Sequence, residues 1–417
     1  MNIHYNSFVL SNGLKVLVHE RTDTQLVAVN VLYHVGARNE SPNRTGFAHL
    51  FEHLMFGGSV NIPEYDKPLQ DAGGDNNAFT SNDITNYYLT LPAENIETAF
   101  WLESDRMLSL AFTPKSLEVQ RKVVMEEFRQ RYLNQPYGDA MLYLRPLIYK
   151  KHPYKWSTIG KKLSHISGAS LDDVKAFFYK HYAPNNAILT VAGNIKTAQV
   201  KKLSEKWFGP IPSREIERNP LPVESPQRAY RSLQIVRNVP ADAIYMAFKM
   251  PARLDPMYAA CDLLSDILGN GRSSRLYAAL VDKKKVFSDI RAYIAGSLDP
   301  GFLVIEGKLL PGIKIEKAEA AIRKVLDLFI EKKVTEQELE KVKNKSESTF
   351  LFSNMGVSNI AMNLGYYELL GDASMINNES LMYREVTVQD IQKMAVLILA
   401  RNKACVLHYL KSARNES

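Results

Sequence analysis

The chain has 417 residues, of which 46% are hydrophobic and 23% are charged, a composition that predicts two or three globular domains and excludes a disordered or collagen-like chain. The net charge of +7 does not indicate nucleic-acid binding, because acidic and basic residues are interleaved as on solvated helix faces. No apolar run reaches the roughly 18 residues of a membrane helix, so neither nucleic acid nor a membrane is expected as a partner.

Hydrophobic periodicity predicts the same order of elements in both halves of the chain: strand, strand, helix, strand, helix, helix. In the first half these elements are expected at 14–19, 27–34, from about 45, 86–91, 93–110 and 114–132. In the second half they are expected at 233–237, 243–249, 256–268, 301–309, 316–332 and 335–352. We therefore predict one structural unit used twice.

A polar stretch with prolines at 210, 212, 220, 222 and 226 separates the halves. Because proline interrupts helices and central strands, we predict a linker at 210–228 between an N-terminal domain, 1–209, and a homologous C-terminal domain, 229–417. Each domain is expected to be α+β, with a mainly antiparallel sheet packed against helices.

The chain ends and the cysteines indicate neither export nor redox chemistry. Residues 1–6 lack a basic segment followed by an apolar one, so we expect a cytoplasmic protein unless a leader has been removed. Cys261 and Cys405 lie in apolar stretches and are expected as core residues rather than as a disulfide or a metal site.

The helix expected from about residue 45 contains the pattern H-x-x-E-H at His49, Glu52 and His53. Two histidines four residues apart project from one helical face, so both imidazoles can bind one metal ion. Glu52 lies at the edge of that face, where a carboxylate can act on water as a general base. A core position explains one such histidine, but not the pair with its carboxylate. The pattern is typical of zinc proteases.

A third ligand is expected from another element, because catalytic zinc usually has three protein ligands and one position for water. The helix predicted at 114–132 carries Glu118, Glu126 and Glu127, and an antiparallel placement could bring one of them to the histidines. The spacing leaves Glu126 and Glu127 open, because they point about 100° apart.

Further motifs extend over essentially the whole chain. They are Phe8 to Val18, Val35 to Glu40, Gly46 to Phe56, Gly73-Gly74, Asn77 to Ser81, Gln120 to Glu127, Tyr182 to Asn186 and Ser273 to Leu276. In these motifs and their order, the sequence resembles the pitrilysin-like (inverzincin) zinc metallopeptidases, in particular half-length members of the bacterial and mitochondrial-processing-peptidase type.

The resemblance implies an endopeptidase that hydrolyses extended or unfolded peptides with Zn²⁺ as cofactor. It implies that His49, His53 and Glu127 bind zinc and that Glu52 activates the water molecule. The family usually has a glutamate behind the ligands at the position of Gln120. This departure weakens the expected support of the ligands, which can matter roughly 10- to 100-fold.

The resemblance also implies an edge strand beside the zinc, onto which a peptide adds as a further strand. It would contain Asn77, Ala78, Phe79 and Thr80. From the residues alone, a loop followed by an ordinary edge strand is the better explanation of this segment.

In the family, an arginine and a tyrosine after the S-R-L motif hold the substrate carbonyl. Here these positions are Val281 and Ser288, and nearby Arg291 and Tyr293 are out of register. Since each lost oxyanion donor costs roughly 10²-fold or more in rate, the chain alone is expected to be a poor catalyst. The resemblance thus implies the zinc-bearing subunit of a dimer, either with a paralogue that provides Arg and Tyr or with a second copy.

Two other classes of function stay open. A non-catalytic scaffold subunit needs no ligands, whereas this sequence retains the three ligands and the base. A peptide-binding subunit with structural zinc needs a fourth ligand, and no candidate is apparent near the motif.

Overall fold

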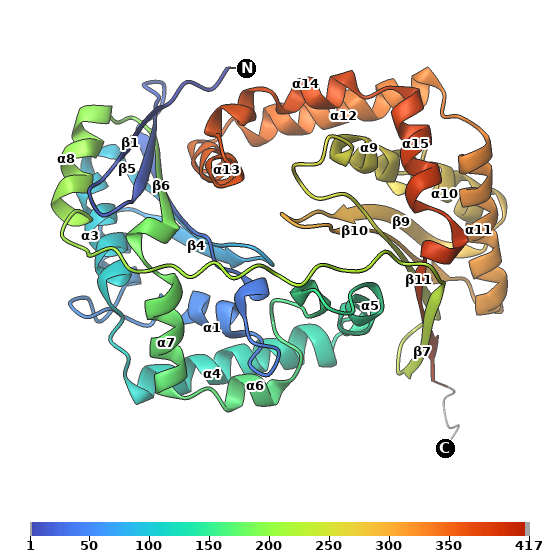
Figure 1. Ribbon diagram of the computed structural model, residues 1–417, viewed down its shortest axis with the longest axis horizontal. Helices are drawn as coiled ribbons and strands as arrows, with labels where there is room; N and C mark the ends of the chain where they lie inside the picture. The colour runs from blue at the N-terminus through green and yellow to red at the C-terminus, as the bar shows by residue number, and fades with distance from the viewer. Residues whose placement is uncertain (1, 413–417) are drawn as a thin grey trace. The chain divides into compact units, whose positions relative to one another are not determined.

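The computed structural model describes residues 2–412, which form two sheets packed against helices (Figure 1). The strands of the first sheet are β1 (Asn6–Val9), β2 (Lys15–Glu20), β3 (Leu26–Tyr33), β4 (Asp75–Thr80), β5 (Thr85–Pro92) and β6 (Ala187–Gly193). Those of the second are β7 (Arg231–Arg237), β8 (Ala243–Lys249), β9 (Phe287–Ala295), β10 (Phe302–Leu309) and β11 (Cys405–Lys411).

The longer helices alternate with these strands along the chain. In the first half they are α1 (Phe47–Leu54), α2 (Asp66–Asp71), α3 (Ile96–Leu108), α4 (Pro114–Phe128), α5 (Ala140–Ile148), α6 (Leu163–Ser167), α7 (Leu171–His181) and α8 (Thr197–Trp207). In the second half they are α9 (Tyr258–Gly269), α10 (Arg275–Tyr277), α11 (Ile315–Glu331), α12 (Glu336–Ser353), α13 (Val357–Leu370), α14 (Glu379–Glu385) and α15 (Val388–Ile398). The predicted α+β class is confirmed.

The two sheets have the same topology. Their strand orders are β1-β2-β6-β3-β5-β4 and β7-β11-β8-β10-β9, so every strand of the second sheet has a counterpart and β1 is an addition to the first. In both sheets one pair is parallel, β2 with β6 and β7 with β11, and the other pairs are antiparallel. The predicted repeat is confirmed, and each sheet is mainly antiparallel, as expected, with one parallel pair.

The described chain forms two compact units that are discontinuous in sequence. One consists of residues up to 128 with 156–221 and 350–378, and the other of 129–155, 222–349 and 379 onward. The reason is an exchange of equivalent helices: α5, which follows α4, packs on β7, β8 and β11, whereas α13, which follows α12, packs on β3 and β6.

The change of unit between Leu221 and Pro222 falls inside the predicted linker, and no helix or strand is present from Phe208 to Tyr230. The predicted boundaries at 1–209, 210–228 and 229–417 stay a prediction about the repeat along the sequence, because a segment can pack on the sheet of the other half. Met1 and residues 413–417, at the ends of these domains, lie outside the described residues.

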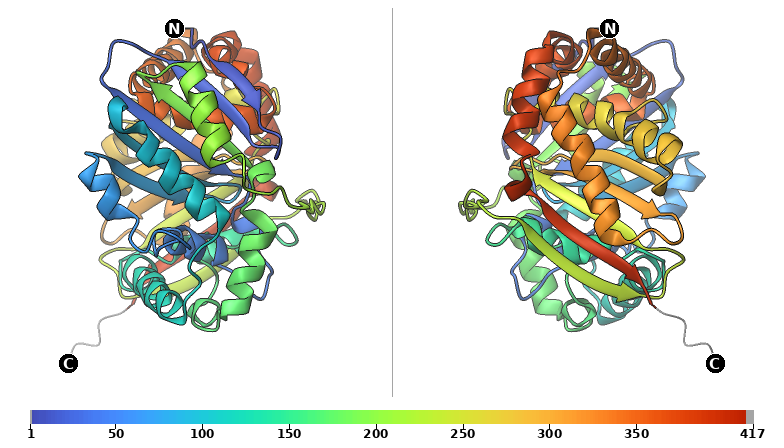
Figure 2. Two further views of the ribbon diagram at one scale, coloured as in Figure 1. Left: turned by 90° about the vertical axis from the view of Figure 1, so that its left-hand side faces the viewer. Right: turned by 90° about the vertical axis from the view of Figure 1, so that its right-hand side faces the viewer.

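Helices cover both faces of the first sheet. α3 and α8 lie on one face and α13 lies on the other (Figures 1 and 2). The approach of α13 depends on Gly365, because a Cβ at this position would lie 3.1 Å from Asn30 Nδ2 and 3.2 Å from Thr190 Oγ1. Both faces of the central strands β3 and β6 are therefore shielded from water.

The second sheet is also buried on both faces. Alternate residues of β8 point to opposite sides: Ile244 and Phe248 pack with the group of α9, α11 and α15, whereas Tyr245 and Ala247 pack with α5. Figure 2 (right) shows α11 in front of this sheet. The apolar runs of β8 and β11 follow from this double burial.

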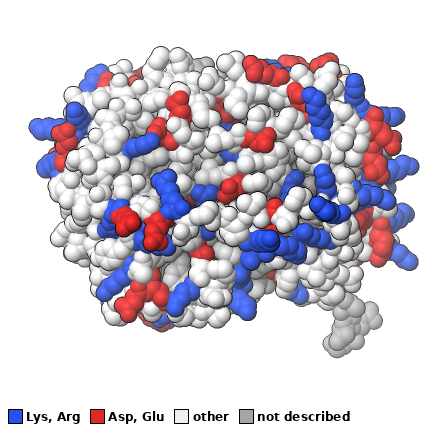
Figure 3. Space-filling view, viewed as in Figure 1, with Lys and Arg blue, Asp and Glu red and all other residues white. Residues whose placement is uncertain are grey.

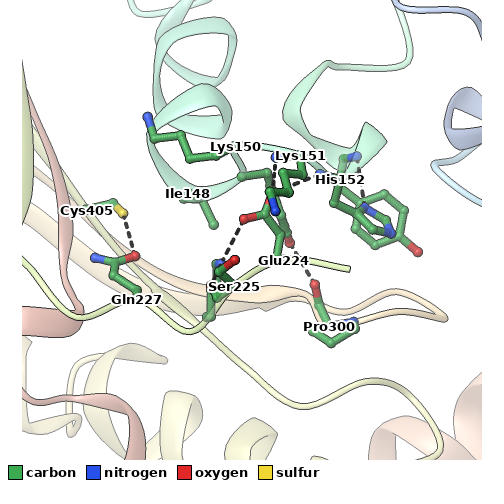
Figure 4. Close-up of polar contacts among 12 residues, drawn as sticks. Ile148, Lys150, Lys151, His152, Glu224, Ser225, Gln227, Pro300 and Cys405 are labelled. Atoms are coloured by element: carbon green, nitrogen blue, oxygen red, sulfur yellow. Dashed lines mark hydrogen bonds and ion pairs between the residues drawn. The ribbon is translucent and has the colours of Figure 1, made fainter. Parts of the chain in front are cut away.

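The end of the linker is attached to its own unit through Glu224 (Figure 4). Its carboxylate accepts hydrogen bonds from the backbone N–H groups of Lys151 and His152, the latter at 2.8 Å, and pairs with Lys249 Nζ at 3.4 Å. Burial opposes ionisation of Glu224, but these interactions outweigh it and lower the pKa of the carboxyl. The segment is fixed where it enters β7.

The surface carries both signs of charge. On the face drawn in Figure 3, basic and acidic side chains are interspersed, as the sequence predicts. None of the described helices combines the length and apolar character that crossing a bilayer requires.

Candidate metal centre

The helix α1 separates an apolar face from a polar one. Its buried residues are Phe47, Ala48, Leu50, Phe51 and Leu54. The remaining residues are the three of the H-x-x-E-H pattern, and all are half-buried. The ring of Phe51 stacks on Tyr182, with centroids 5.2 Å apart. Burial of one face thus fixes the direction in which the polar face points.

The N-terminus of α1 is held by two features that the sequence did not predict. Gly46 has φ +88°, and a Cβ there would lie 2.6 Å from the carbonyl oxygen of Ile159. The Glu40 carboxyl accepts hydrogen bonds from the backbone N–H groups of Gly46 and Ala48, both at 2.9 Å. Burial raises the pKa of Glu40 to about 8, against the lowering effect of these bonds. An acidic residue shortly before a helix start is the sequence signal for such a contact.

Three predicted ligands converge in the first unit. Glu127 Oε2 lies 3.5 Å from His49 Nε2 and 3.4 Å from His53 Nε2. The two imidazole rings are perpendicular, with centroids 4.9 Å apart. The side chains are 13%, 24% and 17% exposed for His49, His53 and Glu127, so the site is open on one side.

The structure distinguishes Glu126 from Glu127, between which the spacing of the sequence could not choose a third ligand. Among the described residues, the group that could hold a metal ion contains Glu127 and not Glu126. Glu127 lies in the last turn of α4, which packs against α1. Its role as a ligand stays a prediction.

The distances fit a zinc ion. Ligand atoms about 2.0 to 2.1 Å from zinc at tetrahedral angles lie about 3.4 Å apart, and the carboxylate oxygen is 3.5 and 3.4 Å from the two imidazole nitrogens. Two imidazoles and one carboxylate are also the donor set of catalytic zinc sites with one position for water. His49, His53 and Glu127 would hold the ion.

The predicted base contacts the predicted substrate strand. Thr80 Oγ1, at the end of β4, donates a hydrogen bond of 2.5 Å to Glu52 Oε2. Among the described strands, β4 pairs with β5 alone and is an edge strand. Along β4, Asn76, Ala78 and Thr80 are half-buried, whereas Asn77 and Phe79 are exposed. Binding of substrate by Asn77 to Thr80 stays a prediction.

Gln120 lies on α4 two turns before Glu127. With Phe56, Tyr65 and Val119 it lines a cavity of about 660 Å³, and its Nε2 would be 3.7 Å from a Cβ at Gly57. The amide thus faces the segment after α1. Support of the metal ligands by Gln120 stays a prediction.

In the second unit, the residues at the positions expected for the arginine and the tyrosine have structural roles. Val281 packs against the core of its unit, and Ser288 Oγ donates to the carbonyl of Lys308 at 3.2 Å. Arg291 and Tyr293 both bind Glu306 of the neighbouring strand β10, Tyr293 Oη at 3.0 Å. These two side chains are therefore engaged within their own sheet.

Comparison with known proteins identifies the family. The family model described as Insulinase (Peptidase family M16) matches residues 15–158. A second model, described as Peptidase M16 inactive domain, matches residues 168–346. Zinc protease PqqE of Helicobacter pylori is 32% identical over 400 residues, or 94% of this chain and 89% of that protein. The chain belongs to peptidase family M16. The resemblance predicted from the motifs is confirmed.

Solved M16-like structures have the same fold. A protease from Helicobacter pylori aligns with a TM-score of 0.91 and 30% identity over 98% of this chain and 99% of that chain. The periplasmic protease PqqL from Escherichia coli aligns with a TM-score of 0.79 and 18% identity, over 98% of this chain but 48% of that chain. This M16 chain therefore has the length of one half of the larger protein.

The burial of Glu40 makes stability depend on pH. The pKa of Glu40 is raised from 4.5 to about 8, so its contribution to stability is fully present below 4.5 and is lost as the pH rises through about 8. Glutamine cannot ionise. We expect the difference in Tm between the wild type and Glu40→Gln to decrease from pH 5 to pH 9, measured in EDTA to exclude metal effects. Glu94→Gln, at an exposed position, is the control; a difference independent of pH would contradict the assignment.

Metal affinity should depend on Glu127 and not on its neighbour. Removing a ligand should weaken zinc binding by more than the roughly 10- to 100-fold caused by residues behind the ligands. We therefore expect Glu127→Gln to lose zinc and Glu126→Gln to retain it, measured by titration against a chromogenic chelator. Equal affinities of the two variants would exclude Glu127 as a ligand.

Proposed function

We propose that this M16 chain is a zinc-dependent endopeptidase that cleaves extended or unfolded peptides. The observation that supports it most is the convergence of His49, His53 and Glu127 next to Glu52. A scaffold needs neither the ligands nor the base, and structural zinc normally has four closed ligands. The name zinc protease of the relative at 32% identity supports the same activity.

In the proposed reaction, the imidazoles of His49 and His53 and the Glu127 carboxylate would hold the ion. Bound zinc provides a Lewis acid that lowers the pKa of a water molecule and polarises the scissile carbonyl. The Glu52 carboxylate accepts a proton from the attacking water, while the water oxygen forms a bond to the carbonyl carbon. Glu52 then donates this proton to the leaving amine nitrogen as the C–N bond breaks. Glu52 is thereby restored to a carboxylate.

The proposed substrate lies along β4. The outer edge of β4 pairs with none of the described strands, so it can form main-chain hydrogen bonds with an extended peptide, as in other β-strand additions. Such bonds do not depend on side-chain identity, so we expect a broad range of unfolded peptides as substrates. Phe79 is 41% exposed and offers an apolar contact on the face opposite Thr80.

We further propose that the chain acts as the zinc-bearing subunit of a pair. The side chain of Val281 has no hydrogen-bond donor, and the Ser288 hydroxyl donates to the carbonyl of Lys308. Arg291 and Tyr293 are bound to Glu306. A paralogue with the missing Arg and Tyr would complete the site, and a pair of identical chains is the alternative assembly. The alignment with 48% of PqqL supports a division of a longer peptidase into two chains. The predicted cytoplasmic location stays a prediction.

A second candidate function is a non-catalytic or peptide-binding subunit of a larger assembly. The observation in its favour is the description inactive domain for the match over residues 168–346. The candidate ligands lie outside this match and within the Insulinase match at residues 15–158. The endopeptidase therefore remains the better supported function.

Replacing the base should separate chemistry from metal binding. Glu52→Gln keeps the shape of the side chain but cannot accept the proton, so kcat/KM on an unstructured peptide should fall by about 10²- to 10⁴-fold. Zinc content should equal that of the wild type. Wild-type turnover by Glu52→Gln would remove this residue from the mechanism, and loss of zinc would assign it a structural role.

Activity should depend on the partner. One restored oxyanion donor is worth roughly 10²-fold, so mixing the chain with a paralogue that carries Arg and Tyr should raise the rate by at least that factor. The measurement is peptide cleavage at increasing partner concentration, with light scattering to follow the complex. The complex made with Glu52→Gln is the control. Full activity of the chain as a monomer would contradict the proposal.

A further inference from the structure

The segment 36–40 is tied to the turn that follows β4. The backbone N–H groups of Ala37 and Arg38 donate to the carbonyl oxygens of Ser81 and Asn82 at 3.1 and 2.9 Å. A Cβ at Gly36 would lie 2.6 Å from the carbonyl oxygen of Asn82, so only glycine permits this approach. The sequence motif at 35–40 thus has a structural role of its own: it holds the turn that follows β4.

The turn itself is well defined. Arg38 Nη1 pairs with Asp83 Oδ1 at 3.1 Å, and their side chains are 12% and 7% exposed. Ser81 Oγ accepts hydrogen bonds from the backbone N–H groups of Asp83 and Ile84, both at 3.1 Å. The end of β4 is therefore held in place by main-chain and side-chain contacts together.

The same short segment holds α1. It ends at Glu40, whose carboxyl binds the N-terminus of that helix. Residues 36–40 thus fix both the helix that carries Glu52 and the turn that follows Thr80. The hydrogen bond between Thr80 and Glu52 joins two elements that are already fixed to a common support.

A hydrogen bond at one carboxylate oxygen also orients the other. The last torsion of a glutamate side chain is broad and roughly two-fold. The bond from Thr80 Oγ1 to Glu52 Oε2 selects one orientation of the carboxylate plane, and this determines where Oε1 lies. Orientation of a base matters, because a misplacement of about 1 Å can cost about 10²-fold in rate.

We infer that Thr80 is a positioning residue for Glu52, and that it links the edge strand to the orientation of the base. This inference rests on the proposed function. A peptide that pairs with β4 contacts the strand that carries Thr80, so docking of the substrate and alignment of Glu52 are coupled through one hydroxyl group.

Valine tests this role because it keeps the β-branched shape and the strand preference of threonine but has no hydroxyl. We expect Thr80→Val to lower kcat by about 10- to 100-fold and to leave KM, zinc content and Tm unchanged. Thr80→Ser restores the hydroxyl and should recover most of the rate. Thr90→Val, a half-buried position on β5, is the matched control and should behave as the wild type.

Some outcomes would overturn the inference. A wild-type kcat for Thr80→Val would do so, as would an equal loss in Thr80→Ser, or a loss explained by reduced zinc content or Tm. If the wild type cleaves and Glu52→Gln does not, a normal Thr80→Val rejects the positioning role while the proposed function stands.

A second measurement does not require turnover. Crystal structures of the zinc-loaded wild type and of Thr80→Val should show one Glu52 rotamer in contact with Thr80 and a displaced or multiple Glu52 rotamer in the variant. If Glu52 points away from Thr80 in the wild type, or is unchanged in the variant, the inference fails even where the activity itself is absent.

Discussion

The candidate metal centre depends on how a helix of eight residues is held in place. An isolated helix of this length is unstable in water, so α1 exists because its apolar face packs on the rings of the first unit and because Glu40 and Gly46 fix its start. Both histidines and Glu52 lie on the remaining face. Without this support, the imidazoles would have no fixed separation from a carboxylate on α4.

Much of the local structure could be predicted because it is written in short-range patterns. The strands expected at 14–19 and 86–91 and the helix expected from about 45 match β2, β5 and α1 within one or two residues. The pair His49 and His53 follows from helical spacing alone. Glu127 required the resemblance, since spacing does not distinguish it from Glu126.

Long-range features could not be predicted in this way. The amphipathic patterns of α5 and α13 require an apolar surface but do not specify which sheet provides it, so the exchange of these helices has no local signal. The contacts of Glu40 with α1 and of Thr80 with Glu52 join residues 6 to 28 positions apart. Their side chains are compatible with many environments. The fold of the loop before α1 brings Glu40 to the helix, and the placement of β4 brings Thr80 to Glu52.

Comparison of the two halves shows why, among the described residues, the candidate ligands lie in the first half. The helix α9 occupies the place of α1, between the counterparts of β3 and β4, but almost all of its residues are buried. Burial raises the pKa of Cys261 far above that of a free thiol, which disfavours the thiolate that metal binding requires. A helix that is buried on almost every side is stabilised mainly by packing, and in α9 the side chain of Asp262 accepts a hydrogen bond from Tyr383 Oη at 2.7 Å. The helix α1 differs in presenting a half-buried polar face, from which two imidazoles can reach one metal ion.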